Sequence, residues 1–194
     1  MKITPEILKE ICPHISIDAS LLYPTYLNEY FPKWEIDTIQ RMQMFIAQVA
    51  HESGSFKYTR EIASGNAYEG RKDLGNLFPG DGKRFKGHGL IQITGRSNHQ
   101  TCSLALFGDN RLLLNPDILT TPRYATESAC WFWKTRGLNE LCDKPEDWEK
   151  TIIRNDGKTK TYSKIQYITR KINGGLNGIN EREEFYERAR KAIV

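Results

Sequence analysis

The chain has 194 residues, of which 39% are hydrophobic and 27% are charged, and its formal net charge is +4 at pH 7. A chain of this size and composition can bury a core of its own, which excludes wholesale disorder, a collagen-like chain and a disulfide-dense miniprotein. The charge suits an anionic partner, but an excess of this size is also ordinary for a solubilising surface. We expect one domain over residues 1–194, and a monomer.

Residues 1–36 are predicted to be a helical part without a functional motif. Thr4 and Pro5 mark a helix start, with an N-cap residue before a proline at the first helical position, and Pro13 ends this helix. No segment reaches the ~20 apolar residues that span a bilayer, and residues 1–12 lack the apolar run of a secretory signal. We expect a protein made in the cytoplasm without a signal peptide or an integral membrane segment.

A second, amphipathic helix is predicted from about Thr38 to Glu52. Asp37 and Gln40 have the spacing of a capping box, and Gly54 stops the helix. The apolar residues between them recur at helical spacing: Ile39, Met42, Ile46, Val49 and Ala50.

The middle of the chain is predicted to be loop and short strand, because eight glycines fall within residues 64–95. Residues 89–94 alternate partly and are typical of a short strand. If that strand continues, one face carries a row of polar side chains suited to bonding a sugar: Gln92, Thr94, Arg96 and Asn98. The alternative is an ordinary solvent-facing strand edge.

Three further helices are predicted in the second half. One starts at Thr121 and Pro122 and closes at Gly137, and one containing residues 165–172 ends at Gly174. The last helix is predicted to start with Asn180 as its cap. Between them, residues 158–160 are expected to form an exposed loop.

The sequence indicates no metal or cofactor. The segment after His51 has Ser55 where a zinc metalloprotease needs a second histidine, and His88 and His99 look isolated. A basic cluster within residues 71–86 lacks the interleaved aromatic residues of a nucleic-acid site, so we expect no nucleic-acid partner. The cysteines show no metal-ligand spacing, and we expect buried free thiols, with one disulfide as the alternative outside the cell membrane: Cys12, Cys102, Cys130 and Cys142.

Acidic residues around residue 52 suggest acid–base chemistry. A carboxyl group at a half-buried helix end tends to keep its proton, because desolvation and the negative end of the helix dipole both disfavour the anion, and this suits Glu52 as a general acid. Inverting glycosidases hold a second carboxylate ~6.5–9.5 Å away, with room for a water. Glu61, Glu69 and Asp73 are candidates for it, and spacing alone selects none of them. The alternative for each of these acidic residues is an ordinary charged side chain on the protein surface.

Several segments together resemble glycoside hydrolase family 19, and more narrowly its compact phage and bacterial endolysin branch. They are HES (51–53), YTRE (58–61), YEGRKDLGN (68–76), PGDGKRFKGHGLIQITGRSN (79–98) and TRKINGGLNGINER (169–182). The resemblance covers about residues 39–194. It implies a mainly α, lysozyme-like fold of two lobes with a central cleft and a short segment rich in strand and loop. It also implies metal-free hydrolysis of β-1,4 glycosidic bonds with inversion.

The resemblance also implies roles for individual residues. Glu52 matches the general acid, Glu61 the general base, and Thr94 the residue that helps to hold the attacking water. The residues that match substrate-binding or site-shaping positions are His51, Gln92, Asn98, Asn173 and Arg182. The chain departs from the family where it has His88, His99 and Asn177, and the last of these weakens the case for an ion pair of residue 177 with Arg182.

From these observations we expect a lytic glycosidase that cuts bacterial peptidoglycan, either an endolysin or a wall-directed toxin, acting on the cell wall after release. A chitinase is the alternative enzyme, and a glycan-binding module that no longer cuts is the alternative from another class. The sequence does not identify an accompanying holin or immunity protein.

Overall fold

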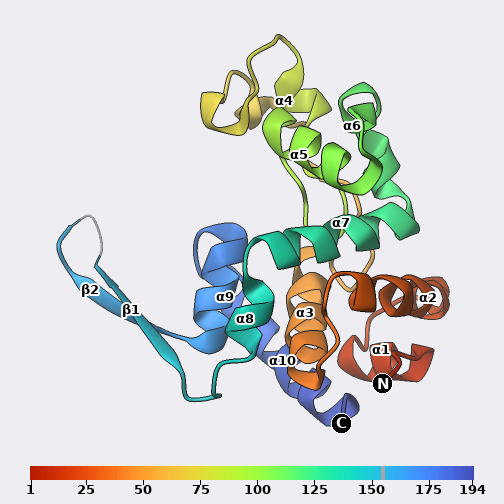
Figure 1. Cartoon of the computed structure of the whole chain (residues 1–194), viewed down its shortest axis with the longest axis vertical. Helices are drawn as coiled ribbons and strands as arrows, with labels where there is room; N and C mark the ends of the chain where they lie inside the picture. Colours follow the sequence, from red (N-terminus) through yellow and green to blue (C-terminus); the bar gives the residue numbers. More distant parts are fainter. Residues whose placement is uncertain (154–155) are drawn as a thin grey trace.

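The computed structural model of the chain describes residues 1–153 and 156–194. Helices dominate this part of the chain, and the strands form one small antiparallel sheet (Figure 1). The α-helices are α1 (Pro5–Ile11), α2 (Ile17–Lys33), α3 (Ile39–Glu52), α4 (Asp81–Arg84), α5 (Arg96–Phe107), α6 (Arg111–Leu114), α7 (Pro122–Thr135), α8 (Leu138–Cys142), α9 (Lys164–Asn173) and α10 (Ile179–Ala192). The strands are β1 (Glu149–Ile153) and β2 (Thr159–Ser163), and short 3-10 helices are η1 (Asn66–Tyr68), η2 (Lys72–Leu74) and η3 (Pro116–Thr120).

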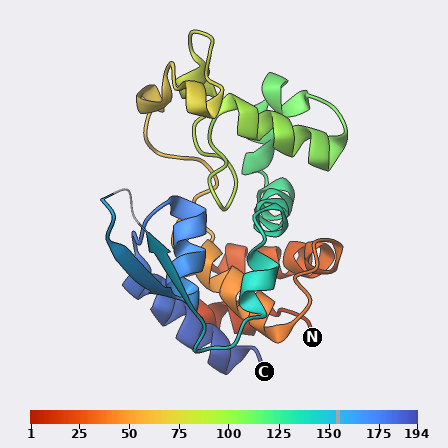
Figure 2. The same cartoon turned by 60° about the vertical axis from the view of Figure 1, so that its left-hand side comes forward.

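The helices are arranged in two lobes. The N-terminal and C-terminal helices form one lobe around α3, while α4, α5 and α6 form the other, and α7 lies at the junction (Figures 1 and 2). The chain enters the second lobe directly after α3, where Arg60 and Ile93 both form bridges with His88. This arrangement confirms the predicted mainly α, two-lobed, lysozyme-like fold.

The core of the larger lobe is built around α3, whose residues from Met42 to Ala50 are all buried. Its main packing partner is α10. A run of aromatic rings ties α3 to its other neighbours, since Phe45 packs edge-on against Phe31 of α2 and Trp133 of α7, with ring centroids 5.2 Å apart in both pairs. Helix α3 is therefore held by a packed core on several sides.

The structure confirms the predicted N-cap of α1 but not the predicted caps of α3 and α10. Thr4 caps α1 before Pro5, as expected, with its hydroxyl accepting from the Ile7 N–H. The predicted capping box at Asp37 is wrong, because Thr38 is the N-cap of α3 and accepts from the Arg41 N–H. The predicted cap at Asn180 is also wrong. Helix α10 starts at Ile179, after Gly178 in a left-handed conformation with φ of 70°.

Two predictions of regular structure fail, and the bounds of one helix were not predicted. Residues 89–94 are a turn rather than a strand, and α5 starts at Arg96, so the polar row is not extended. Residues 158–160 are exposed as expected, but Thr159 and Lys160 already belong to β2. The helix whose bounds were not predicted is α2, which contains Pro24 and Pro32.

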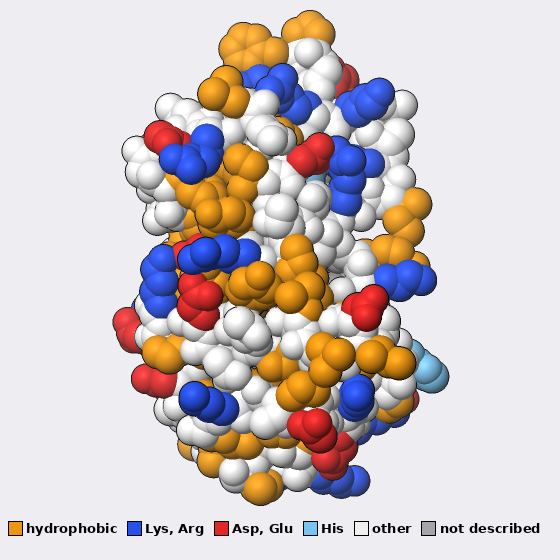
Figure 3. Space-filling view, turned by 90° about the vertical axis from the view of Figure 1, so that its right-hand side faces the viewer, with side chains coloured by type: hydrophobic (Ala, Val, Ile, Leu, Met, Phe, Trp, Pro, Cys, Tyr) orange, Lys and Arg blue, Asp and Glu red, His pale blue; other side chains and the backbone are white. Residues whose placement is uncertain are grey.

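The surface mixes charges of both signs. On the face shown in Figure 3, basic and acidic side chains are interspersed around a band of hydrophobic ones. Among residues 1–153 and 156–194, no helix combines the length and the apolar character that crossing a membrane requires.

All four cysteines are free and buried, which confirms the expected buried thiols. Burial raises the pKa of Cys12 to about 12 and raises the pKa of Cys102, Cys130 and Cys142 as well. Because the thiolate is the reactive form, we expect no labelling of the native protein by a thiol-specific disulfide reagent at pH 8. After denaturation all four should react. Fast labelling of the native chain would contradict this packing.

Candidate active site

Glu52 is the last residue of α3 and is partly buried at the end of the helix. The guanidinium of Arg182, from α10, donates a hydrogen bond to Glu52 Oε1. Arg182 is itself only 1% exposed, so this ion pair is fixed from the protein interior. The resemblance placed Arg182 near the cleft, and the structure shows that its partner is the candidate acid.

A buried polar network holds Arg182 in turn. Its Nη1 donates to Gln48 Oε1 at 2.6 Å, and its Nε donates to the backbone oxygen of Asn177 at 3.2 Å. The Gln48 amide also donates to Thr169 Oγ1 of α9 at 3.1 Å. Satisfied buried networks of this kind rigidify their surroundings. No sequence motif predicts this role for Gln48, although a polar residue one turn before Glu52 on an apolar helix face is a signal for it.

His51 contacts the start of α10. Its Nδ1 lies 2.5 Å from Glu181 Oε2, and its ring packs on Gly178. A Cβ atom at position 178 would lie 1.9 Å from His51 Cε1, and the backbone there has positive φ, so only glycine fits. His51 therefore helps to set how α10, and with it Arg182, lies against the end of α3.

Glu61 lies in the other lobe. Its backbone N–H donates to the Gly87 oxygen at 2.9 Å, and the Gly87 N–H donates back to Glu61 Oε2 at 2.8 Å. The Tyr68 hydroxyl donates to Glu61 Oε1 at 2.9 Å. Burial raises the pKa of Tyr68, and the bond to Glu61 adds to this, so the phenol stays a donor. Tyr68 lies in the quoted YEGR segment but was not singled out by the sequence analysis.

The two rival carboxylates have other partners. Both oxygens of Glu69 accept backbone N–H groups, from Gly80 at 2.7 Å and from Gly82 at 2.7 Å, and so hold the loop at the start of α4. Asp73 forms an exposed pair with Arg71, two residues away. Of the three candidates, Glu61 is the partly buried one.

Three polar residues of the GHGLIQITGRSN segment, Gln92, Thr94 and Asn98, line a common cavity of about 240 Å³. Gln92, Thr94 and Asn98 are hydrogen-bonded within their own turn: Thr94 Oγ1 donates to the Gln92 oxygen at 2.9 Å, and Asn98 Nδ2 donates to the Thr94 oxygen at 2.7 Å. The remaining lining comes from Leu74, Ile91, Ile93, Trp131, Phe132, Arg136, Lys171 and Ile172. The predicted grouping is therefore found, although through a turn and a helix start and not through a strand.

Arg96, predicted to share that face, does not join the cavity. It forms a two-bond pair with the buried carboxylate of Asp81, at 2.6 and 2.8 Å. Arg96 and Asn98 lie on a helix, where residues two apart point in different directions.

Neither Glu52 nor Glu61 belongs to the lining of this cavity among the described residues. Gly87, which donates to Glu61, lies beside the cavity residue Gln92. A Cβ atom at position 87 would lie only 2.5 Å from Gln92 Oε1. Asn173 ends α9 directly after Lys171 and Ile172, which line the cavity. Its side chain closes the following loop by accepting from Gly175 N at 2.9 Å and donating to the Asn177 oxygen at 3.2 Å.

His88 and His99 are not isolated, contrary to the sequence analysis. Both are buried, and His88 Nδ1 lies 3.1 Å from His99 Nε2. His99 Nδ1 donates to the Gly95 oxygen at 2.8 Å, while His88 Nε2 lies 3.2 Å from Asp117 Oδ1, which also pairs with Arg60. Within the described part of the chain, no group of three or more His, Cys, Asp or Glu residues could hold a metal ion.

This histidine pair predicts loss of stability in acid. Burial lowers the pKa of His99 to about 3 and also lowers the pKa of His88. Protons therefore bind the unfolded chain more readily than the folded one. The contribution of neutral His99 to the free energy of unfolding is complete above pH ~6.5 and is lost towards pH 3, at about 1.4 kcal/mol per pH unit. Urea unfolding at several pH values should show this slope, and H99Q should reduce it. An equal slope in H99Q would contradict the prediction, and H14Q, at an exposed histidine, is the control.

The mainly α-helical fold of two lobes is lysozyme-like. The sequence profile described as "Chitinase class I", that of glycoside hydrolase family 19, matches residues 39–190, and this family match shows that the chain is a glycosidase. The chain belongs to glycoside hydrolase family 19, and it is a chitinase-like glycosidase.

Known proteins agree with this assignment. A family 19 domain-containing protein of Haemophilus influenzae is 30% identical over 182 residues, covering 76% of this chain and 78% of that protein. The acidic 27 kDa endochitinase of Solanum lycopersicum is 29% identical over 78% of this chain, which spans 64% of the tomato protein. Chitinase C of Streptomyces griseus shares the fold, with a TM-score of 0.67 at 18% identity over 98% of this chain and 76% of that one.

Proposed function

We propose that the protein is a lytic glycosidase that hydrolyses the β-1,4 bonds of bacterial peptidoglycan. The observation that carries the choice of substrate is the pair of cations, Arg136 and Lys171, in the lining of the cavity that holds Gln92, Thr94 and Asn98. Chitin is uncharged, whereas peptidoglycan strands bear carboxylates on their peptide branches. A groove lined with positive charge raises the local concentration of such a substrate. The proposed place of action is the cell wall, as for an endolysin or a wall-directed toxin.

The proposed reaction is a single displacement. Glu52 protonates the glycosidic oxygen, and Glu61 takes a proton from a water that attacks the anomeric carbon from the opposite face of the sugar. Thr94 helps to hold that water, and its hydroxyl is already oriented by the Gln92 oxygen. His51, Gln92, Asn98, Asn173 and Arg182 bind the glycan or shape the site. The contacts fix the position of each carboxylate, since Glu61 accepts from Tyr68 and Gly87, and Glu52 pairs with Arg182. The Arg182 cation favours the anion of Glu52, so in this proposal Glu52 takes up its proton when the glycan binds.

A chitinase is the second candidate, because the tomato relative is an endochitinase and the Streptomyces griseus neighbour is a chitinase. The deciding experiment compares the turbidity loss of purified cell walls with the release of fragments from chitin oligomers. We expect rapid clearing of walls and slower release from chitin. Activity on chitin alone would refute the choice of peptidoglycan. Mass spectrometry of the digest then shows which sugar carries the new reducing end.

A further inference from the structure

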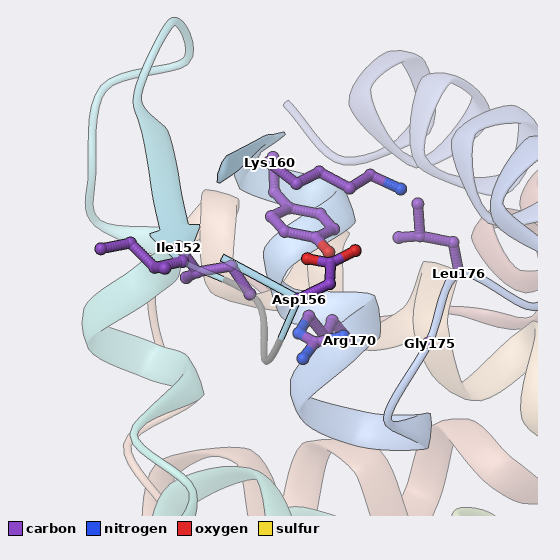
Figure 4. A pocket seen from close by; sticks show the side chains of 8 residues that line it. Ile152, Asp156, Lys160, Arg170, Gly175 and Leu176 are labelled. Atoms are coloured by element: carbon purple, nitrogen blue, oxygen red, sulfur yellow. The ribbon is translucent and has the colours of Figure 1, made fainter. Parts of the chain in front are cut away.

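A second and larger cavity lies under the β1–β2 hairpin. The hairpin projects from the larger lobe beside α9 (Figure 2). Between it and the loop after α9 is a cavity of about 580 Å³ (Figure 4). Figure 4 shows Ile152 and Leu176 on opposite sides of this cavity, with Asp156 and Arg170 between them. We call it the hairpin cavity.

The lining of the hairpin cavity combines apolar and charged groups. Ile152, Ile153 and Leu176 provide aliphatic surface, and Ile153 is 77% exposed on β1. Lys160 and Arg170 provide two positive charges. With the carboxylate of Asp156, the lining keeps one excess positive charge.

The two cations are held in position before any ligand arrives. Tyr162 is buried, and its ring contacts both of them, with Lys160 Nζ 5.1 Å and Arg170 Cζ 5.5 Å from its centroid. Arg170 Nη1 also donates to the Gly174 oxygen at 3.2 Å. A preorganised cation loses less conformational entropy when it binds an anion, which increases affinity.

Residues of one helix, α9, line both the hairpin cavity and the cavity of the candidate active site. Arg170 lines the hairpin cavity, while the next two residues of α9, Lys171 and Ile172, line the active-site cavity. The chain then returns to the hairpin cavity at Gly175 and Leu176. The last turn of α9 therefore contributes side chains to both cavities.

We infer that the hairpin cavity binds the peptide branch of the peptidoglycan strand held in the active-site cleft. This inference rests on the proposed function. The branch is a short peptide with free carboxylates and alanine methyl groups. Its carboxylates match Arg170 and Lys160 through charge-assisted hydrogen bonds, and its methyl groups match the aliphatic wall. An unsubstituted chitin chain has no peptide branch and no carboxylates, so the cavity distinguishes the two polymers.

The test measures binding of two soluble probes, a wall disaccharide and the same disaccharide with its tetrapeptide, to the full chain by calorimetry. We expect the peptide to improve the affinity of the wild type by about tenfold, the size of one to two charge-assisted hydrogen bonds. R170Q and K160A should each lose most of this gain and keep the affinity for the disaccharide. K191A, at an exposed lysine on α10, is the matched control. Thermal melting verifies that each variant is folded.

Equal affinity of the wild type for the two probes would overturn the inference, and so would a full peptide gain in R170Q and K160A. The turbidity assay on whole walls is separate. Tight, Arg170-dependent binding of the peptide probe by a protein that does not clear walls would support the hairpin cavity and refute the proposed function. Clearing of walls by a protein whose affinity is not improved by the peptide would support the proposed function and refute peptide binding in the hairpin cavity.

Discussion

Replacing Glu52 with glutamine is expected to abolish hydrolysis and to leave glycan binding intact. Glutamine has the same shape, and its amide oxygen still accepts the hydrogen bond from Arg182, so the fold should persist, at lower stability because the buried guanidinium loses its counter-charge. The amide has no proton to give to the leaving oxygen. By the usual size of general acid–base contributions, turnover should fall by about 10²–10⁴ or more. The measurement is reducing-end release together with binding of a glycan oligomer.

A matched control is E184Q, at a glutamate on α10 that pairs with Arg188 on the protein surface. It should behave as the wild type in both assays. Residual activity of E52Q within a few-fold of the wild type would show that Glu52 is not the acid. Parallel loss of turnover and of binding would show that its role is to position the glycan.

Replacing Glu61 with glutamine is expected to give the second largest loss. The proposed base must accept a proton from water, which an amide does not do, so turnover should again fall by about 10²–10⁴. Gly87 N and the Tyr68 hydroxyl both donate to this carboxylate, and an amide can satisfy only one of them through its oxygen. Added azide separates chemistry from structure. It can attack the anomeric carbon without a base, so it should restore turnover of E61Q and leave E52Q inactive.

The comparison variant is E69Q. Glu69 holds the N–H groups of Gly80 and Gly82, so its replacement should lower the free energy of unfolding by about 1 kcal/mol while the enzyme stays active. If E69Q loses turnover, regains it with azide, and E61Q stays active, the base has been assigned to the wrong residue.

The sequence predicted helices best where a cap and a regular apolar period coincide. Helix α3 has both, and the prediction from about Thr38 to Glu52 differs from the structure only at its start. Helix α2 lies within residues 1–36, which were predicted to be helical, but its bounds were not predicted. Tertiary packing of its buried face keeps it continuous through its two prolines. The β1–β2 hairpin was missed, because its mostly exposed residues show no alternation of polar and apolar side chains.

For the candidate site too, some features could be predicted from the sequence and others could not. Motif resemblance supplied residues that the structure brings into two groups, Glu52 with Arg182, and Gln92 with Thr94 and Asn98. The sequence did not predict which residues anchor them, because Gln48 and Tyr68 act through contacts between distant segments. The strand predicted for residues 89–94 failed for a local reason. Gln92 adopts a positive φ of 58°, which turns the chain and is stabilised by a bond from its own amide to the Gly89 oxygen.

The most direct test of the proposed mechanism is the anomeric form of the first product, read by proton NMR within minutes of adding enzyme to a β-linked oligomer. One displacement by a water that Glu61 activates inverts the anomeric carbon, so the α-anomer should appear first and the β-anomer should follow only as the sugar mutarotates. A β-anomer in the earliest spectra would mean retention through two displacements. That result would contradict the role of Glu61 as the base that activates water.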